Sequence, residues 1–171
     1  MLTDKFGYGK GLRTGKAPND DVYTPPEIAK IMLEYLPYSE GETFLEPCRG
    51  KGAIYDCLPD NKDWCEIKEG RDFFEWQKEV DWIITNPPYS IFDSFVGHCC
   101  EVARNVVLLC PLSKLVSSMG RIRRLESYGN PVSVFILSAS KCGFPFGFPA
   151  CVVHFQKGYK GETEISIDKK A

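Results

Sequence analysis

The residues best suited to chemistry are Asn86, Pro87, Pro88 and Tyr89, which follow Thr85 and the apolar run of residues 82–84. A buried strand that ends in this tetrapeptide would carry a rigid turn, because each proline fixes its own φ angle. The Asn86 side-chain oxygen and the Pro87 carbonyl are hydrogen-bond acceptors, and Tyr89 adds an aromatic face. These groups suit a flat nitrogen substrate such as the amine of a nucleobase. An ordinary Pro-Pro turn after a strand is the competing interpretation of these four residues alone.

A second pattern precedes this one, where the apolar residues 44–45 lead to Glu46 and a glycine-rich turn follows. Gly50 and Gly52 would let the backbone approach a ligand closely, with the start of a helix facing it. Only these two glycines of the G-x-G-x-x-G dinucleotide fingerprint are present, so the turn alone is a weak signal. The Glu46 carboxylate would repel pyrophosphate and attract a cation. S-adenosylmethionine, which carries an ammonium and a sulfonium, therefore fits better than NAD.

Together the two patterns resemble the S-adenosylmethionine-dependent amino-methyltransferases, above all the N6-adenine DNA methyltransferases. Three more segments are similar to motifs of that family and occur in the same order. Residues 23–28 resemble its N-terminal cofactor motif, Glu66 resembles the acidic end of its second strand, and residues 70–74 resemble its adenine-contacting turn. The resemblance extends from about residue 23 to residue 156. It implies a cofactor-binding set of Tyr23, Thr24, Pro25, Glu46, Pro47, Cys48, Gly50, Gly52, Glu66, Asp72, Phe73 and Asn86.

The resemblance also makes Asn86, Pro87, Pro88 and Tyr89 the catalytic residues. An adenine N6 amine is a poor nucleophile, because its lone pair is delocalised into the ring. Two acceptors on its N–H bonds, the Asn86 oxygen and the Pro87 carbonyl, would favour a more tetrahedral nitrogen. Catalysis would then depend on proximity and preorganised dipoles. We expect neither a metal nor a catalytic histidine.

Two further segments carry candidate substrate contacts. The loop of residues 141–149 places three aromatic rings among glycines and prolines, and one of them could stack on a flipped base opposite Tyr89. Rings that fill the core are the alternative. A helix near residues 112–125 carries a basic face that could hold phosphates. The predicted substrate-binding residues are Tyr89, Phe144, Phe146, Lys114, Arg121 and Arg124.

The acceptor is open at this point. Sequence-specific members of the family carry a large target-recognition domain, for which 171 residues leave no room. We favour adenine in DNA, read with little specificity or with the help of a specificity subunit or a homodimer. Adenine in RNA is an alternative, as is a glutamine amide of a protein, because enzymes with that acceptor share the tetrapeptide. A non-catalytic cofactor-binding subunit is a further alternative.

Composition agrees with one domain, which we expect to span residues 23–171, after a flexible basic arm of residues 1–22. The arm could instead close on phosphate. A net charge of −2 argues against strong nonspecific binding to nucleic acid. The eight cysteines include no C-x-x-C pair, so a zinc site is not expected. No apolar run is long enough to span a membrane and no signal peptide is visible, so a cytoplasmic protein is expected.

The elements that would position these residues alternate between strand and helix, which indicates a three-layer α/β sandwich. The family resemblance implies a mostly parallel, seven-stranded Rossmann-like sheet. We expect strands at residues 43–46, 63–67, 81–85, 106–110, 131–137 and 150–156. Helices are expected after a capping box at Thr24, at residues 53–58, after a cap at Ser90, and at residues 112–125. The stretch from Ile67 to Gly70 is too short for the second crossover helix of the family, so that helix should be missing.

Overall fold

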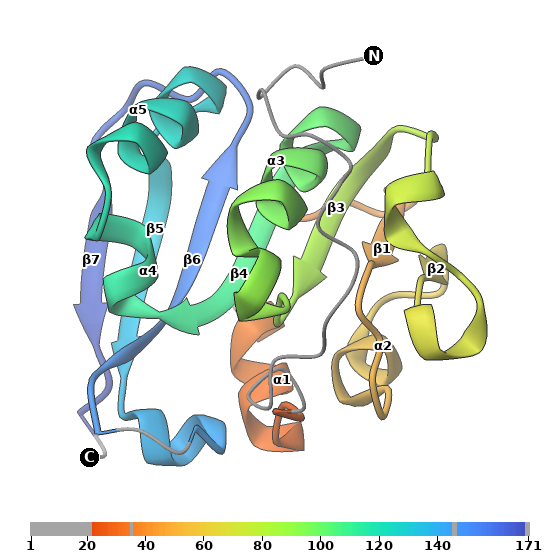
Figure 1. Cartoon of the computed structure of the whole chain (residues 1–171), viewed down its shortest axis with the longest axis horizontal. Coiled ribbons are helices and arrows are strands. Elements are labelled where there is room, and N and C mark those ends of the chain that lie inside the picture. The colour runs from red at the N-terminus through yellow and green to blue at the C-terminus, as the bar shows by residue number, and fades with distance from the viewer. Residues whose placement is uncertain (1–21, 35, 145–146, 170–171) are drawn as a thin grey trace.

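The protein was analysed as a computed structural model, which describes residues 22–34, 36–144 and 147–169. Its strands are β1 (Phe44–Glu46), β2 (Lys62–Trp64), β3 (Val80–Thr85), β4 (Ala103–Pro111), β5 (Pro131–Leu137), β6 (Ala150–Gln156) and β7 (Glu164–Ile167). They form one sheet in the order β2-β1-β3-β4-β6-β5-β7 (Figure 1). Strand β6 runs antiparallel to β4 and β5, and the other neighbouring pairs are parallel. The predicted mostly parallel, seven-stranded Rossmann-like sheet is therefore confirmed.

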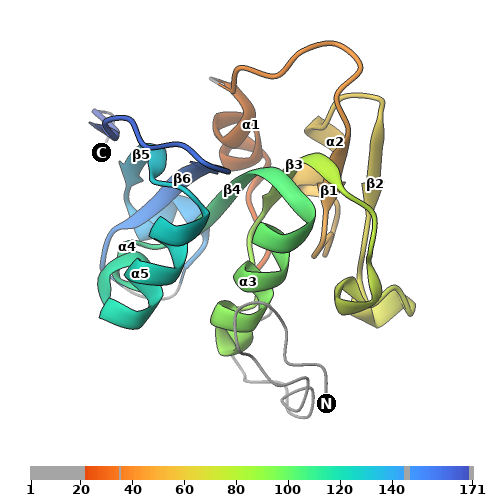
Figure 2. The same cartoon turned by 90° about the horizontal axis from the view of Figure 1, so that it is seen from above.

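Helices cover both faces of the sheet, as Figure 2 shows. Helices α1 (Pro26–Glu34) and α2 (Ala53–Cys57) lie on one face, and α3 (Phe92–Val102), α4 (Leu112–Val116) and α5 (Met119–Tyr128) lie on the other. Side chains of β3 alternate between the two layers of core. Trp82 and Ile84 pack in the cluster that includes Ile28 of α1, whereas Ile83 packs in the cluster that includes Phe95 of α3. The predicted three-layer arrangement is thus confirmed.

The connection from β2 to β3, residues 65–79, is described throughout and contains no α-helix. It holds two single-turn 3₁₀ helices, Ile67–Glu69 and Phe73–Glu75. The expectation that a crossover helix is missing is confirmed. Strand β2 ends earlier than the predicted residues 63–67, because the backbone of Glu66 turns to bridge Arg71. Strand β2 lies at one edge of the sheet, and the predicted cofactor-binding residue Glu66 lies just beyond its end.

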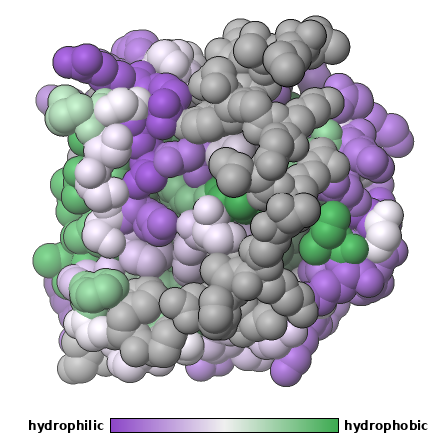
Figure 3. Space-filling view, viewed as in Figure 1, coloured by the Kyte–Doolittle hydropathy of each residue, from purple (hydrophilic) through white to green (hydrophobic). Residues whose placement is uncertain are grey.

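The seventh strand lies at the opposite edge, where β7 pairs in parallel with β5. The sequence predicted its existence only through the family resemblance and did not predict its position. All four residues of β7 are exposed, and the side chains of Ile165 and Ile167 are 66% and 65% exposed. Figure 3 shows hydrophobic residues gathered along the edge of the molecule that carries β7. Ile165 and Ile167 alternate with polar residues, but four exposed residues are too few for this pattern to distinguish a strand from a loop.

Two helix predictions need correction. The helix predicted directly after Ser90 begins later, at Phe92, because a 3₁₀ turn at Tyr89–Ile91 comes first. The single helix predicted for residues 112–125 is two helices, α4 and α5. The Ser118 hydroxyl accepts from the backbone N–H of Arg121 and begins α5. No helix within the described ranges is long and apolar enough to cross a bilayer.

Candidate functional site

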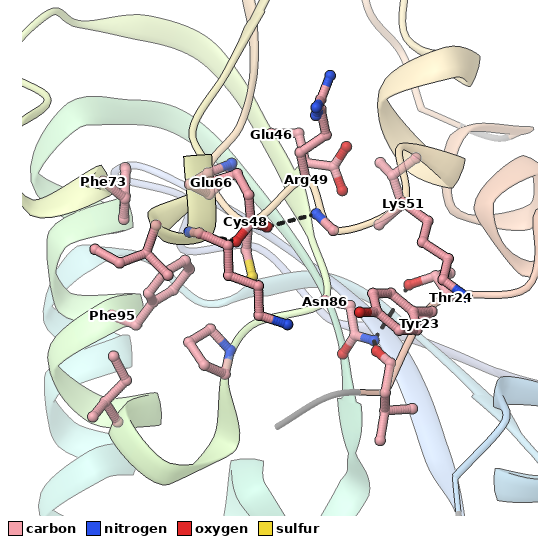
Figure 4. A pocket seen from close by; sticks show the side chains of 18 of the residues that line it. Tyr23, Thr24, Glu46, Cys48, Arg49, Lys51, Glu66, Phe73, Asn86 and Phe95 are labelled. Carbon is pink, nitrogen blue, oxygen red and sulfur yellow. Dashed lines mark hydrogen bonds between the residues drawn. The ribbon is translucent and has the colours of Figure 1, made fainter. Parts of the chain in front are cut away.

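A cavity of about 290 Å³ opens at the carboxyl ends of β1, β2 and β3 (Figure 4). Ligands of open α/β sheets bind at this edge, and drug-sized pockets start at about 300 Å³. Most of the predicted cofactor-binding residues line the cavity. They are Tyr23, Thr24, Glu46, Pro47, Cys48, Gly50, Glu66, Asp72, Phe73 and Asn86. Pro25 and Gly52 are not among the lining residues.

Glu46 ends β1 with a buried carboxyl group that lines the cavity. Only 2% of the residue is exposed, and its Oε2 atom has no hydrogen-bond partner among the described residues. Burial raises the pKa of Glu46 to about 9, although the Tyr55 backbone amide and Arg49 oppose the shift. A buried polar oxygen without a partner is costly, and a cationic ligand would supply one. The carboxyl group therefore fits the ammonium end of S-adenosylmethionine.

The glycine turn after β1 is tied to the end of β2. Gly50 has a φ angle of +53°, in the left-handed region that favours glycine, and its N–H donates to Oε2 of Glu66 at 2.8 Å. The other oxygen of Glu66 accepts from the Lys68 N–H at 3.1 Å. Gly52 also has a positive φ angle, of 88°, and directly precedes α2. The two turns that carry the predicted cofactor residues thus form one unit.

Aromatic side chains stand on opposite sides of the cavity, with Tyr23 on one side and Phe73 and Phe95 on the other (Figure 4). The Phe73 and Phe95 ring centroids are 4.9 Å apart. Asp72 precedes Phe73 and caps the second 3₁₀ turn, where its Oδ1 atom accepts from the Phe74 N–H at 2.9 Å. These rings give the cavity apolar surface on both sides.

The sequence prediction missed the cations at this cavity. Lys51 lies over the Tyr23 ring with its Nζ atom 4.4 Å from the centroid, and Lys68 lies over the same ring at 5.9 Å. Arg49 pairs with Glu69. All three cations line the cavity. Arg49 and Lys51 flank Gly50 directly, so their place in the glycine turn was the signal that could have identified them.

The turn after β3 holds Asn86 in one orientation beside the same cavity. The Asn86 Nδ2 atom donates to the Val22 carbonyl at 3.1 Å and to the Thr24 hydroxyl at 3.3 Å. Its Oδ1 atom accepts from the Tyr89 hydroxyl at 2.6 Å. Asn86 and Pro88 line the cavity. The structure therefore brings the predicted catalytic asparagine next to the predicted cofactor residues. Val22 and Thr24 accept hydrogen bonds from Asn86 and line the same cavity.

The described rings of the aromatic loop differ in their surroundings. Phe144 is buried, and its ring meets the Tyr89 ring edge-on at 5.7 Å and 79°. It fills the core in this conformation, which agrees with the alternative interpretation. Phe148 is exposed. Phe146 lies outside the described residues, as do residues 1–21 of the predicted N-terminal arm.

Three basic residues predicted to bind phosphate, Lys114, Arg121 and Arg124, make contacts within the chain. The Lys114 Nζ atom donates to the Tyr89 carbonyl at 3.1 Å. Arg121, whose side chain is 12% exposed, pairs with Asp93 through two nitrogens. Arg124 lies 3.8 Å from the same carboxylate. Arg121 holds the pKa of Asp93 below its ordinary value. This arrangement differs from the sequence-based expectation, because cross-element pairs leave no pattern along the chain.

The histidines have structural contacts. His154 is buried, and its Nε2 atom lies 3.0 Å from the Asn105 side-chain oxygen. Burial lowers the pKa of His154 to about 4. His98 contacts Glu101 and the Trp76 carbonyl. Within the described part of the chain, no group of His, Cys, Asp and Glu is arranged to hold a metal ion.

Sequence comparison alone finds no relative, since no protein-family model and no curated protein matches the chain. Solved structures do match. A protein of Listeria monocytogenes, provisionally described as a class I S-adenosylmethionine-dependent methyltransferase, has a TM-score of 0.66 and 13% identity over 92% of this chain and 69% of that one. The M protein of the type I restriction enzyme EcoKI has a TM-score of 0.63 and 13% identity over 80% of this chain and 44% of that one.

A protein of Pyrococcus horikoshii, provisionally described as an RNA methyltransferase, has a TM-score of 0.60 and 14% identity over 89% of this chain and 94% of that one. The present chain thus spans less than half of the EcoKI subunit but nearly all of the Pyrococcus protein. Identities this low carry information about the fold alone. The chain has the Rossmann-like fold of the class I S-adenosylmethionine-dependent methyltransferases.

Proposed function

We propose that this protein is an S-adenosylmethionine-dependent methyltransferase that acts on the exocyclic N6 amine of adenine in DNA. One observation carries the proposal. The carboxyl group of Glu46, whose Oε2 atom has no partner among the described residues, and the oriented amide of Asn86 line the same cavity at the carboxyl edge of the sheet. A cationic methyl donor and an amine acceptor would meet between these two side chains.

The residues of the cavity fit the cofactor by their chemistry. Glu46 would accept from the ammonium group, and ionise as it does so. Glu66, which lies two residues beyond the end of β2, has a side chain that could turn from the Gly50 N–H to accept from ribose hydroxyls. Phe73 and Phe95 supply apolar surface for the adenine ring. When bound, S-adenosylmethionine supplies an electrophilic methyl group.

The N-P-P-Y turn would act on the amine that receives the methyl group. The Oδ1 atom of Asn86 has a second lone pair besides the one that faces Tyr89, so it can accept from an amine N–H. The Pro87 carbonyl would accept from the other N–H. The Asn86 acceptor is held before substrate arrives, so it would stabilise the transition state with little reorganisation. Tyr89 would stack on the base.

DNA is the favoured acceptor, because the N-P-P-Y turn resembles that of N6-adenine DNA methyltransferases and EcoKI, with its similar fold, is a restriction enzyme. A specificity subunit or a second copy of this chain would then recognise the DNA sequence. The proposed location of the protein is the cytoplasm. RNA is the second candidate acceptor, supported by the fold likeness to the Pyrococcus protein along nearly its whole length. A glutamine amide and a non-catalytic scaffold remain outcomes of the test.

The test uses methyl-labelled S-adenosylmethionine with DNA, RNA and protein acceptors in parallel. Treated nucleic acids are digested to nucleosides and separated by mass. We expect label in N6-methyladenine from DNA. Label in N4-methylcytosine, in RNA alone or in protein alone would overturn the choice of acceptor. A folded chain that binds the cofactor and labels nothing would support the non-catalytic scaffold.

A further inference from the structure

Lys114 makes a contact with the proposed catalytic turn that a phosphate ligand would not need. Its side chain leaves α4, directly after β4, and its ammonium group donates to the Tyr89 carbonyl at 3.1 Å. A hydrogen bond from a charged donor is about twice as strong as a neutral one. The two prolines of the turn fix their own φ angles but do not fix the peptide plane that follows Tyr89. Lys114 holds that plane.

A second set of bonds holds Lys114 in place. The Arg121 Nη1 atom donates to the Lys114 carbonyl at 2.6 Å, and its Nη2 atom donates to Oδ2 of Asp93 at 2.7 Å. Asp93 lies in the first turn of α3, which begins three residues after Tyr89 in the chain. Helices α3, α4 and α5 are therefore cross-linked around the turn.

Both ends of Tyr89 are consequently fixed. Its carbonyl is bound by Lys114, and its hydroxyl donates to Asn86 and lies 3.3 Å from the Leu109 carbonyl. A shift of the Tyr89 backbone would move the hydroxyl that orients the Asn86 amide. Lys114 can thus act on Asn86 through Tyr89 without touching substrate.

We infer that Lys114 is a positioning residue that holds the N-P-P-Y turn in its working geometry, and not a phosphate ligand. The inference rests on the proposed function. It assigns the basic residues Lys114 and Arg121 to an internal brace. Arg123 of α5 is exposed, and its side chain forms no hydrogen bond or ion pair with the described residues. Arg123 is therefore the matched control.

The kinetic experiment compares Lys114→Met, Lys114→Arg and Arg123→Met in the full chain, with saturating S-adenosylmethionine. For Lys114→Met we expect kcat to fall about tenfold, because a charge-assisted hydrogen bond is lost. The KM for nucleic acid and the salt dependence of KM should stay as in wild type. Lys114→Arg should recover most of kcat, and Arg123→Met should leave kcat unchanged. If Lys114→Met instead had a raised KM with a flatter salt dependence and an unchanged kcat, the inference would be overturned, and Lys114 would be a phosphate ligand.

A second readout needs no activity. In nuclear magnetic resonance spectra, the side-chain amide signals of Asn86 are identified by their loss in Asn86→Ala. These signals should shift in Lys114→Met and keep their positions in Arg123→Met. Unshifted signals in Lys114→Met would overturn the inference. If wild type transfers no methyl group, the proposed function fails and this spectroscopic comparison alone decides the role of Lys114.

Discussion

The side-chain oxygen of Asn86 accepts a hydrogen bond from the Tyr89 hydroxyl at 2.6 Å. On its other side, the Asn86 nitrogen donates to the Val22 carbonyl. A flipped amide would set the Asn86 oxygen against the Val22 carbonyl, which is itself only an acceptor, so the Val22 contact selects this orientation. Together with the contact to Tyr89, this holds the Asn86 oxygen, a hydrogen-bond acceptor, in a fixed position just after the end of β3.

This relationship separates two roles of Tyr89. Tyr89→Phe removes the hydroxyl and keeps the ring, so we expect the free energy of unfolding to fall by about 1 kcal/mol and the KM for nucleic acid to stay near that of wild type. Tyr89→Leu also removes the ring and should weaken nucleic-acid binding by about 1–3 kcal/mol. Urea unfolding and steady-state kinetics measure the two effects. Equal KM values for the Phe and Leu variants would show that the ring does not stack on the base.

Glu46 predicts a pH dependence of stability. Its pKa is about 9 in the folded protein against an ordinary value of 4.5, so between these values the folded state binds more protons than the unfolded state. The free energy of unfolding should therefore fall as the pH rises through this window. Glu46→Gln lacks the ionisation, and its stability relative to wild type should increase from pH 5 to pH 9. Urea titrations at several pH values measure this difference, and parallel profiles would contradict the assignment.

The same carboxyl group predicts proton release on cofactor binding. A bound cation favours the ionised form of Glu46 and lowers its pKa. At pH 7 we expect S-adenosylmethionine to displace a proton from wild type, and to bind Glu46→Gln more weakly with less proton release. Calorimetry in two buffers of different ionisation enthalpy detects the proton. An identical heat in both buffers for wild type would argue that Glu46 does not meet the cation.

Gly50 and Gly41 form a matched pair for testing the wall made by Tyr23. Both have positive φ angles, so Gly50→Ala and Gly41→Ala should each destabilise the fold by about 1–2 kcal/mol. A Cβ at residue 50 would lie 3.2 Å from the Tyr23 ring, whereas one at residue 41 meets nothing within 4 Å. We expect only Gly50→Ala to weaken S-adenosylmethionine binding in calorimetric titrations. Equal affinities for the two variants would exclude Tyr23 from the cofactor site.

Much of the site could be predicted from sequence because its residues follow strands. Glu46 directly follows two apolar residues, and Asn86 follows an apolar run and Thr85. In a parallel sheet such positions meet at one edge. The glycine turn was visible from Gly50 and Gly52. The short link after Ile67 correctly indicated a missing crossover helix. These features are local, so the chain displays them without knowledge of tertiary contacts.

Other features depend on contacts between distant residues. The pairing of Arg121 with Asp93 joins two helices, and the sequence shows only a basic helix face. The burial of Phe144 against Tyr89 likewise follows from the path of a loop. Strand β7 has four exposed residues and no buried face to impose a pattern. Each of these features depends on tertiary structure, so the spacing of residues along the chain could not predict it.

The most direct test of the central claim is methyl transfer to adenine-containing DNA by wild type and Asn86→Ala in parallel, with cofactor affinity measured for both. The account predicts N6-methyladenine from wild type. For Asn86→Ala it predicts a slower reaction, with an activation free energy about 3–4 kcal/mol higher, because one preorganised acceptor is lost. The affinity for S-adenosylmethionine should stay within a few fold. Turnover by Asn86→Ala at a near wild-type rate would contradict the account and leave Asn86 as a turn residue.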